Sequence, residues 1–149
     1  MVALGLGACA SSTVEQPVSD YFDCQGLQRA VADAPNEFKN IRVDGRTSRY
    51  AQIWDSRAQA FGNACSVVEG GNNTHYSCAG KIEPEASMTQ LETASSVVGQ
   101  CLGTQWQSST SDNGTVAFHS EDQTAPSVTL NSFRNDRDRQ MIRLRIDPR

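Results

Sequence analysis

Residues 65–78 read Cys-Ser-Val-Val-Glu-Gly-Gly-Asn-Asn-Thr-His-Tyr-Ser-Cys, and they carry a strong β-hairpin signal. Two runs containing β-branched and aromatic residues flank a Gly-Gly-Asn-Asn turn, which predicts two antiparallel strands. A two-residue loop at residues 71–72 places Cys65 directly opposite Cys78. Counting outward from the loop, this pair falls at a non-hydrogen-bonded site, where Cα atoms are about 4.5 Å apart and a disulfide fits. The register therefore makes Cys65 and Cys78 a candidate disulfide pair.

The segment before this hairpin predicts a first helix. Apolar residues at helical spacing extend from Leu27 to Ile41. Asp20 or Asp23 is the candidate N-cap, and Pro35 predicts an end near residue 34 because proline disrupts a helix interior.

The segment after the hairpin predicts a second helix. Ser87 and Gln90 form a capping-box pattern, and Gly103 stands at the expected C-terminal stop. The apolar face consists of Leu91, Ala94, Val97, Val98, Cys101 and Leu102.

Alternation and turn signals predict the remaining strands, at residues 50–56, around Trp106, and at 115–119, 127–133 and 141–147. Residues 44–48 (Asp-Gly-Arg-Thr-Ser) are expected to form a loop. The predicted fold is α+β, with two helices packed on one face of a mainly antiparallel sheet in the order α-βββ-α-ββββ.

Trp54 and Trp106 occupy equivalent places after the two helices, which suggests a weak internal αβββ duplication. We expect both tryptophans to be core anchors.

Composition limits the classes of protein. The chain has 149 residues, a formal charge of −4 and 38% hydrophobic residues, which fits one globular domain and excludes a collagen-like chain, a wholly disordered one and a transmembrane bundle. A pI near 5.1 without a basic stripe argues against nucleic-acid binding.

The amino terminus contains Leu6-Gly7-Ala8-Cys9 followed by Ala-Ser-Ser, which resembles the lipobox of bacterial lipoproteins. The resemblance implies cleavage before Cys9, lipidation of Cys9, and a periplasmic protein anchored to the outer membrane. Residues 1–9 would then be the end of a signal segment, residues 10–20 a flexible tether, and residues 21–149 one disulfide-stapled domain. The alternative is an apolar terminus without this role.

Lipidation of Cys9 would leave four of the five cysteines. An even set in an oxidising periplasm implies two disulfides. With Cys65 and Cys78 paired by register, the second disulfide would join Cys24, at the start of the first helix, to Cys101, at the end of the second. The alternative is a zinc site made by Cys65, His75, Cys78 and Cys101.

Charge is unevenly distributed along the chain. Residues 82–133 contain no Lys or Arg, whereas residues 134–149 contain six Arg. Strict alternation in residues 142–146 points Arg143 and Arg145 to the same side of a strand. We favour protection of an edge strand combined with pairing to the acidic segment as the role of these arginines. The alternative is that they form a face for an acidic partner or anionic headgroups.

Catalytic motifs are not recognisable in the sequence. The chain has two histidines, His75 and His119, and neither belongs to a HExxH pattern; no Gly-x-Ser-x-Gly or phosphate-binding glycine loop occurs. We therefore expect no enzymatic activity, cofactor or metal. The leading hypothesis is a protein that binds another protein or an envelope component, as an assembly or secretion accessory factor or an immunity or inhibitor protein. The alternative is a small periplasmic hydrolase or metal-binding protein centred on His75 or His119.

Overall fold

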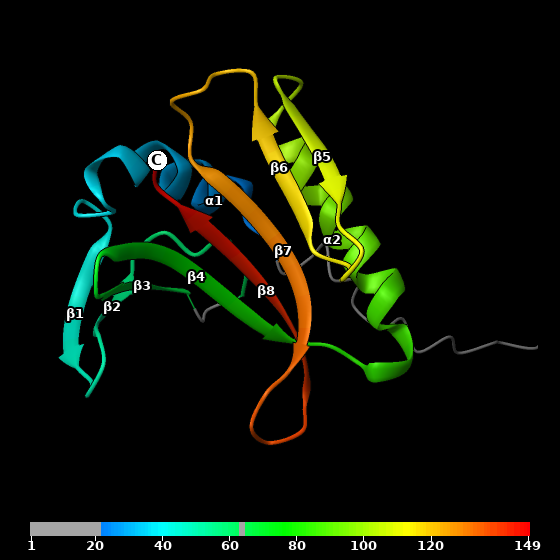
Figure 1. The fold of residues 1–149 in the computed structure, drawn as a ribbon, viewed down its shortest axis with the longest axis horizontal. Helices are drawn as coiled ribbons and strands as arrows, with labels where there is room; N and C mark the ends of the chain where they lie inside the picture. The colour runs from blue at the N-terminus through cyan, green and yellow to red at the C-terminus, as the bar shows by residue number, and fades with distance from the viewer. Residues whose placement is uncertain (1–21, 63–64) are drawn as a thin grey trace, which may run out of the picture.

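Eight strands form a single antiparallel sheet in the computed structural model, which describes residues 22–62 and 65–149 (Figure 1). The strands are β1 (Arg42–Thr47), β2 (Gln52–Ser56), β3 (Cys65–Gly70), β4 (Asn73–Lys81), β5 (Trp106–Thr110), β6 (Val116–Ser120), β7 (Ser127–Arg134) and β8 (Gln140–Asp147). Their order across the sheet is β1-β2-β3-β4-β8-β7-β6-β5. The C-terminal strand β8 therefore lies in the middle of the sheet, and β1 and β5 form its two edges.

Helix α1 (Cys24–Asp33) has the boundaries that its sequence predicts. The side chain of Asp23 accepts a 2.9 Å hydrogen bond from the backbone N–H of Gln25, so Asp23 is the N-cap. The helix gives way to a 3-10 turn, η2 (Ala34–Asn36), at Pro35.

Helix α2 (Ser87–Leu102) ends as expected but begins differently. Gly103 follows the last turn with φ 95°, a conformation that glycine adopts without steric penalty. The expected capping box is absent, because a 3-10 turn, η3 (Pro84–Ala86), runs directly into the helix and the backbone N–H of Ser87 already donates to the carbonyl of Pro84.

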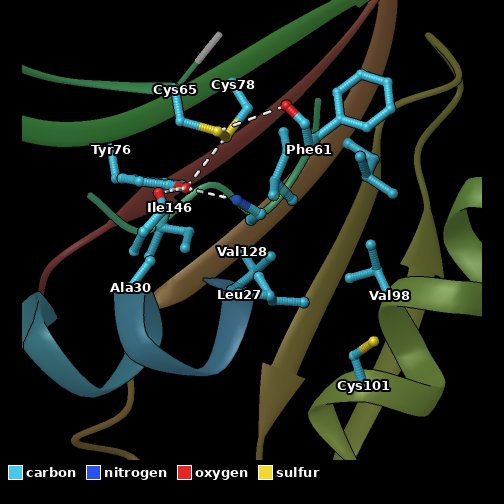
Figure 2. Packing of buried hydrophobic residues seen from close by; sticks show 14 of the residues in the cluster. Leu27, Ala30, Phe61, Cys65, Tyr76, Cys78, Val98, Cys101, Val128 and Ile146 are labelled. Atoms are coloured by element: carbon cyan, nitrogen blue, oxygen red, sulfur yellow. Dashed lines mark hydrogen bonds between the residues drawn. A yellow bond between two sulfur atoms is a disulfide. The ribbon is translucent and has the colours of Figure 1, made fainter. Parts of the chain in front are cut away.

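Both helices cover the same face of the sheet, as the α+β prediction requires. One row of paired strand residues crosses the sheet and is fully or almost fully buried: Val67, Tyr76, Ile146, Val128 and Phe118. Buried residues of α1 (Leu27, Ala30) and α2 (Ala94, Val98) join the same cluster (Figure 2). Alternation along each strand leaves the opposite side of the sheet uncovered by α1 and α2.

The structure has one strand more than predicted, β1, so the element order is α-ββββ-α-ββββ and not α-βββ-α-ββββ. The sequence Asp44-Gly45 reads as a loop, yet Gly45 pairs with Trp54 within the sheet. A Cβ atom at Gly45 would lie 2.7 Å from the indole of Trp54, so the missing side chain makes room for a cross-strand tryptophan. Trp54 and Trp106 are both partly buried at the margin of the core rather than within it.

Two disulfides hold the domain together, and they are the two pairs that the sequence predicts. Cys65–Cys78 joins β3 to β4 with a Cα–Cα distance of 4.1 Å, directly across the predicted register. Cys24–Cys101 joins the start of α1 to the last turn of α2 with a Cα–Cα distance of 5.2 Å. The side chain of Gln28 also donates a 3.1 Å hydrogen bond to the carbonyl of Cys101. The two helices are thus fixed to each other at one end.

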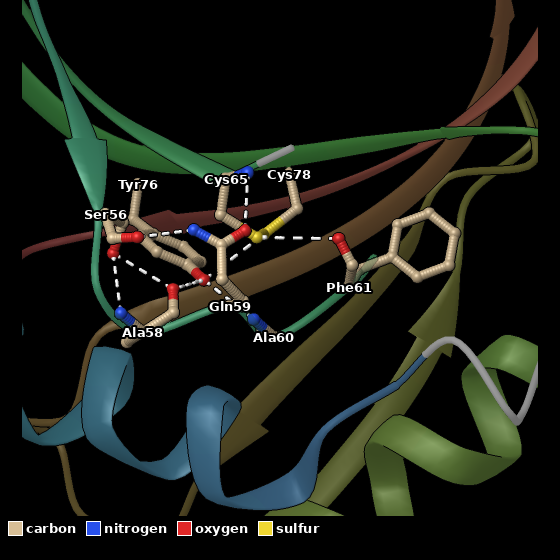
Figure 3. The surroundings of a disulfide bond; sticks show 8 residues. All are labelled: Ser56, Ala58, Gln59, Ala60, Phe61, Cys65, Tyr76 and Cys78. Atoms are coloured by element: carbon tan, nitrogen blue, oxygen red, sulfur yellow. Dashed lines mark hydrogen bonds between the residues drawn. A yellow bond between two sulfur atoms is a disulfide. The ribbon is translucent and has the colours of Figure 1, made fainter. Parts of the chain in front are cut away.

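Next to the Cys65–Cys78 disulfide, Tyr76 ties the β2–β3 connection to the core (Figure 3). Its hydroxyl donates a 2.6 Å hydrogen bond to the carbonyl of Ala58 and accepts a 3.0 Å hydrogen bond from the N–H of Ala60. Burial raises the pKa of the Tyr76 phenol. The hydroxyl therefore remains protonated and satisfies two buried backbone groups.

Candidate functional site

The side of the sheet that faces away from α1 and α2, here called the open face, carries both predicted partner-binding arginines. Arg145 on β8 lies between Ser77 of β4 and Thr129 of β7. Arg143, two residues earlier, lies between Ala79 and Asn131 on the same strands. The arginines therefore stand at the centre of the sheet, flanked by shorter side chains on β4 and β7.

Arg145 is held in place by Asp147. The Nε of Arg145 donates 2.8 Å and 3.0 Å hydrogen bonds to the two carboxylate oxygens, and a terminal nitrogen lies 2.7 Å from Asp147 Oδ1. Both side chains are about one-third exposed, and this hydrogen bonding raises the pKa of Arg145. The pair fixes the orientation of the guanidinium group and offsets part of its charge.

Arg143 is held differently, by an aromatic ring. Its guanidinium carbon lies 4.1 Å from the centroid of the Phe133 ring on β7. Among residues 22–62 and 65–149, no carboxylate lies within ion-pair distance of Arg143. The hydrogen-bond donors of Arg143 and its positive charge are therefore available to a ligand.

Three hydroxyl side chains lie in the same row of the sheet as Arg145. Ser66, Ser77 and Thr129 follow one another across β3, β4, β8 and β7 in the same row as Arg145. Their side chains form no hydrogen bond with the described part of the chain, and all three are half-buried. Together with Arg143 they form a shallow group of donors of the kind that binds carboxylates or phosphates.

His75 lies at the end of this face, on β4. Its Nδ1 is buried and has no hydrogen-bond partner among the described residues. Desolvation by burial lowers the pKa of His75; the positive charges of Arg145 and Arg143 act in the same direction, while Asp147 opposes them. The imidazole is therefore neutral at neutral pH, and it does not add to the positive charge of the arginines.

The structure does not bring the two histidines together. His119 is exposed on β6, and strands β8 and β7 separate β6 from β4, which carries His75.

The alternative prediction of a zinc site is wrong, because Cys65, Cys78 and Cys101 are all in disulfides. Across the described residues, no group of three or more His, Cys, Asp or Glu side chains could hold a metal ion.

The favoured interpretation of the arginines, edge-strand protection, is wrong, because β8 lies between β4 and β7. Among the described residues, no carboxylate of the acidic segment forms an ion pair with either arginine: the charged partner of Arg145 is Asp147, and Arg143 lies over the ring of Phe133. Neither the contact of Arg145 with Asp147 nor that of Arg143 with Phe133 was predicted from the sequence. The signal for Asp147 was the spacing of two residues in an alternating strand, which places it on the same side as Arg145. Phe133 depends on the register between β7 and β8, which the sequence does not reveal.

Comparisons of the chain with protein-family models, with curated proteins and with solved structures gave no match. The predicted lipidation site, Cys9, and the predicted tether at residues 10–20 lie outside the described residues. Within the described residues, no helix has the length and apolar character needed to span a membrane.

Proposed function

We propose that this chain is a lipid-anchored periplasmic binding protein whose open face binds an acidic group of another protein or of an envelope component. The observation that carries the proposal is Arg143, a cation at the centre of a sheet face that neither α1 nor α2 covers, with no carboxylate partner in the described chain. Stacking on Phe133 orients the guanidinium group before a ligand arrives, so less conformational entropy is lost on binding.

The surroundings of Arg143 suit an anion better than an apolar ligand. Arg145, held by Asp147, contributes a second oriented guanidinium group, and the hydroxyls of Ser77 and Thr129 offer further donors. A carboxylate or phosphate binds a guanidinium group through two parallel hydrogen bonds, which gives directional as well as electrostatic recognition.

The cellular role follows from the amino terminus. Lipidation of Cys9 would hold the domain at the outer membrane, where it could act as an assembly or secretion accessory factor or as an immunity or inhibitor protein. Labelling bacterial cells that produce the protein with a clickable fatty acid tests the anchor: the Cys9 protein should be labelled and the Cys9→Ser variant should not.

Binding through the open face is tested with a double variant, R143Q/R145Q, and a matched control, R137Q/R139Q. The control removes the same charge from the exposed β7–β8 connection. Cross-linking in envelope extract, read by mass spectrometry, should give products with the wild type and with the control, and these should be lost in R143Q/R145Q. Equal cross-linking by the two double variants would remove the basis of this proposal.

We also infer that the two αββββ halves derive from one duplicated unit. Support comes from the element order, in which each helix is followed by four antiparallel strands, and from the position of the two final strands, β4 and β8, side by side at the sheet centre.

A further inference from the structure

The two edges of the sheet differ in how well they are protected against pairing with another strand. Edge strand β1 carries charged side chains, and its register shifts between Arg42 and Gly45. Charges and bulges on an edge oppose the addition of a further strand. Edge strand β5 (Trp106-Gln-Ser-Ser-Thr110) contains no charged residue and no proline, and its register with β6 is regular over all five residues. Within the described sheet, β5 is thus the unprotected edge.

The hydrogen bonds that flank the β5–β6 ladder show which backbone groups of β5 face β6. The N–H of Ser111 donates to the carbonyl of Thr115 at 2.9 Å, and the N–H of Glu121 donates to the carbonyl of Gln105 at 2.9 Å. Hydrogen-bonded and non-hydrogen-bonded pairs alternate along an antiparallel ladder. Between these two positions, the odd-numbered residues of β5 therefore bond to β6, and the even-numbered residues point their backbone groups outward.

Ser108 and Thr110 are consequently the residues whose N–H and C=O groups lie on the free edge. Both are exposed, and their backbone groups have no partner outside the ladder in the described chain, whereas the N–H of Trp106 donates to the carbonyl of Gly103. A strand added to β5 would find its hydrogen-bonding groups at Ser108 and Thr110.

A groove accompanies this edge on the helix side of the sheet. Two hollows of about 610 and 550 Å³ lie between α2 and β5, and Ser95 and Ser108 line both. Phe118 lines one hollow; Leu91 and Met88, which is 77% exposed, line the other. Ser108 pairs with buried Phe118, so its side chain points to the helix side. Side chains of an added strand that lie opposite Ser108 would point into the same groove.

The rim of the groove is acidic. Glu92 of α2 and Asp112 after β5 line it, and residues 82–133, which include all of α2, β5 and β6, contain no Lys or Arg. A basic segment is therefore the complementary occupant, and an acidic one would be repelled.

We propose that the β5 edge and the α2–β5 groove bind an extended, basic segment of another protein as an added β-strand. Backbone hydrogen bonds to Ser108 and Thr110 supply register, apolar side chains of the segment enter the groove beside Leu91 and Phe118, and its Lys or Arg side chains meet Glu92 and Asp112. This site lies at the edge of the sheet and is independent of the arginines on the open face, so either proposal can fail without the other.

The test measures, by NMR titration, the binding of an acetylated (Thr-Val-Thr-Lys)2 peptide amide, in which alternation points the valines and lysines to the same side of the strand. The key variant is Ser108→Pro, which removes an N–H that does not belong to the β5–β6 ladder; its matched control is Ser108→Ala, which keeps the N–H. We expect Ser108→Pro to bind about tenfold more weakly and Ser108→Ala within about twofold of the wild type. The E92Q/D112N variant should lose about threefold, together with part of the salt dependence.

A modified peptide tests the same point without changing the protein. N-methylation of the valines keeps charge and side chains but removes the N–H groups that would bond to the edge, and we expect about a tenfold loss. Equal binding of the methylated and unmethylated peptides, or of Ser108→Pro and Ser108→Ala, would overturn the proposal. A dimer of the wild type that Ser108→Pro dissociates would also overturn it, because the edge would then serve a second copy of the chain.

Discussion

Arg145 and Asp147 lie two residues apart on one side of β8, and the Nε of Arg145 donates a 2.8 Å hydrogen bond to Asp147 Oδ2. The central strand of the sheet therefore supplies a cation and its own counterion. If the open face binds an acidic group as proposed, Asp147 is the residue that limits the positive charge available to that group.

We expect Asp147→Asn to strengthen binding of an acidic ligand. Loss of the carboxylate leaves the charge of Arg145 uncompensated, and at low ionic strength this should raise affinity for a hexaglutamate peptide about two- to fivefold. The control is Asp138→Asn, which makes the same charge change in the exposed pair with Arg134. A titration in which both variants bind alike would show that Asp147 has no local effect.

We expect the stability of the domain to fall on acidification because of His75. Its folded-state pKa lies below its ordinary value of 6.5, so below about pH 6.5 the unfolded chain binds a proton that the folded chain resists. The free energy of unfolding should therefore decrease from pH 7.5 toward pH 5.5, and His75→Gln should flatten this slope. Urea unfolding at several pH values measures it; His119→Gln, which retains His75, is the control and should keep the slope.

We expect the two disulfides to contribute unequally to stability. The Cys24–Cys101 bond closes a loop of 77 residues in sequence separation and Cys65–Cys78 one of 13. In the chain-entropy account, removal of the first costs about 4.5 kcal/mol and removal of the second about 3 kcal/mol. Paired serine variants, C24S/C101S and C65S/C78S, compared by urea unfolding, test this order, and the reverse order would contradict it.

We expect Tyr76→Phe to destabilise the domain by about 1–3 kcal/mol, because the N–H of Ala60 and the carbonyl of Ala58 lose a buried partner. Tyr50→Phe is the matched control, since Tyr50 is 82% exposed. Thermal and urea unfolding measure the difference. A Tyr76→Phe protein as stable as Tyr50→Phe would mean that another group, such as water, replaces the hydroxyl both as donor to Ala58 and as acceptor from Ala60.

The sequence predicted the fold where local signals were strong. The Gly71-Asn72 turn set the register that places Cys65 opposite Cys78, and Asp23 and Gly103 marked helix ends. Strand β1 was not predicted, because glycine normally signals a loop. The reason for a glycine at position 45 is the indole of Trp54 on the next strand, a contact that the local sequence does not reveal.

In the candidate site, too, local patterns were predicted correctly and long-range contacts were not. Alternation placed Arg143 and Arg145 together on one side of a strand, but the position of that strand depends on long-range pairing. Because β8 pairs with both β4 and β7, the arginines lie at the centre of the sheet and not at the predicted edge. The same pairing places the Phe133 ring of β7 against Arg143.

The Cys24–Cys101 bond has a mechanical consequence. Tension applied to the chain ahead of Phe22 reaches Cys24 almost at once and passes through the sulfur–sulfur bond directly into the last turn of α2. Residues 25–100 then form a covalent loop outside the line of force and cannot be extended while the bond is intact. If the protein were pulled at its proposed membrane anchor and held by a proposed partner near β8, the load would pass through this disulfide. A reducing agent would then add residues 25–100 to the stretch of chain that carries the load.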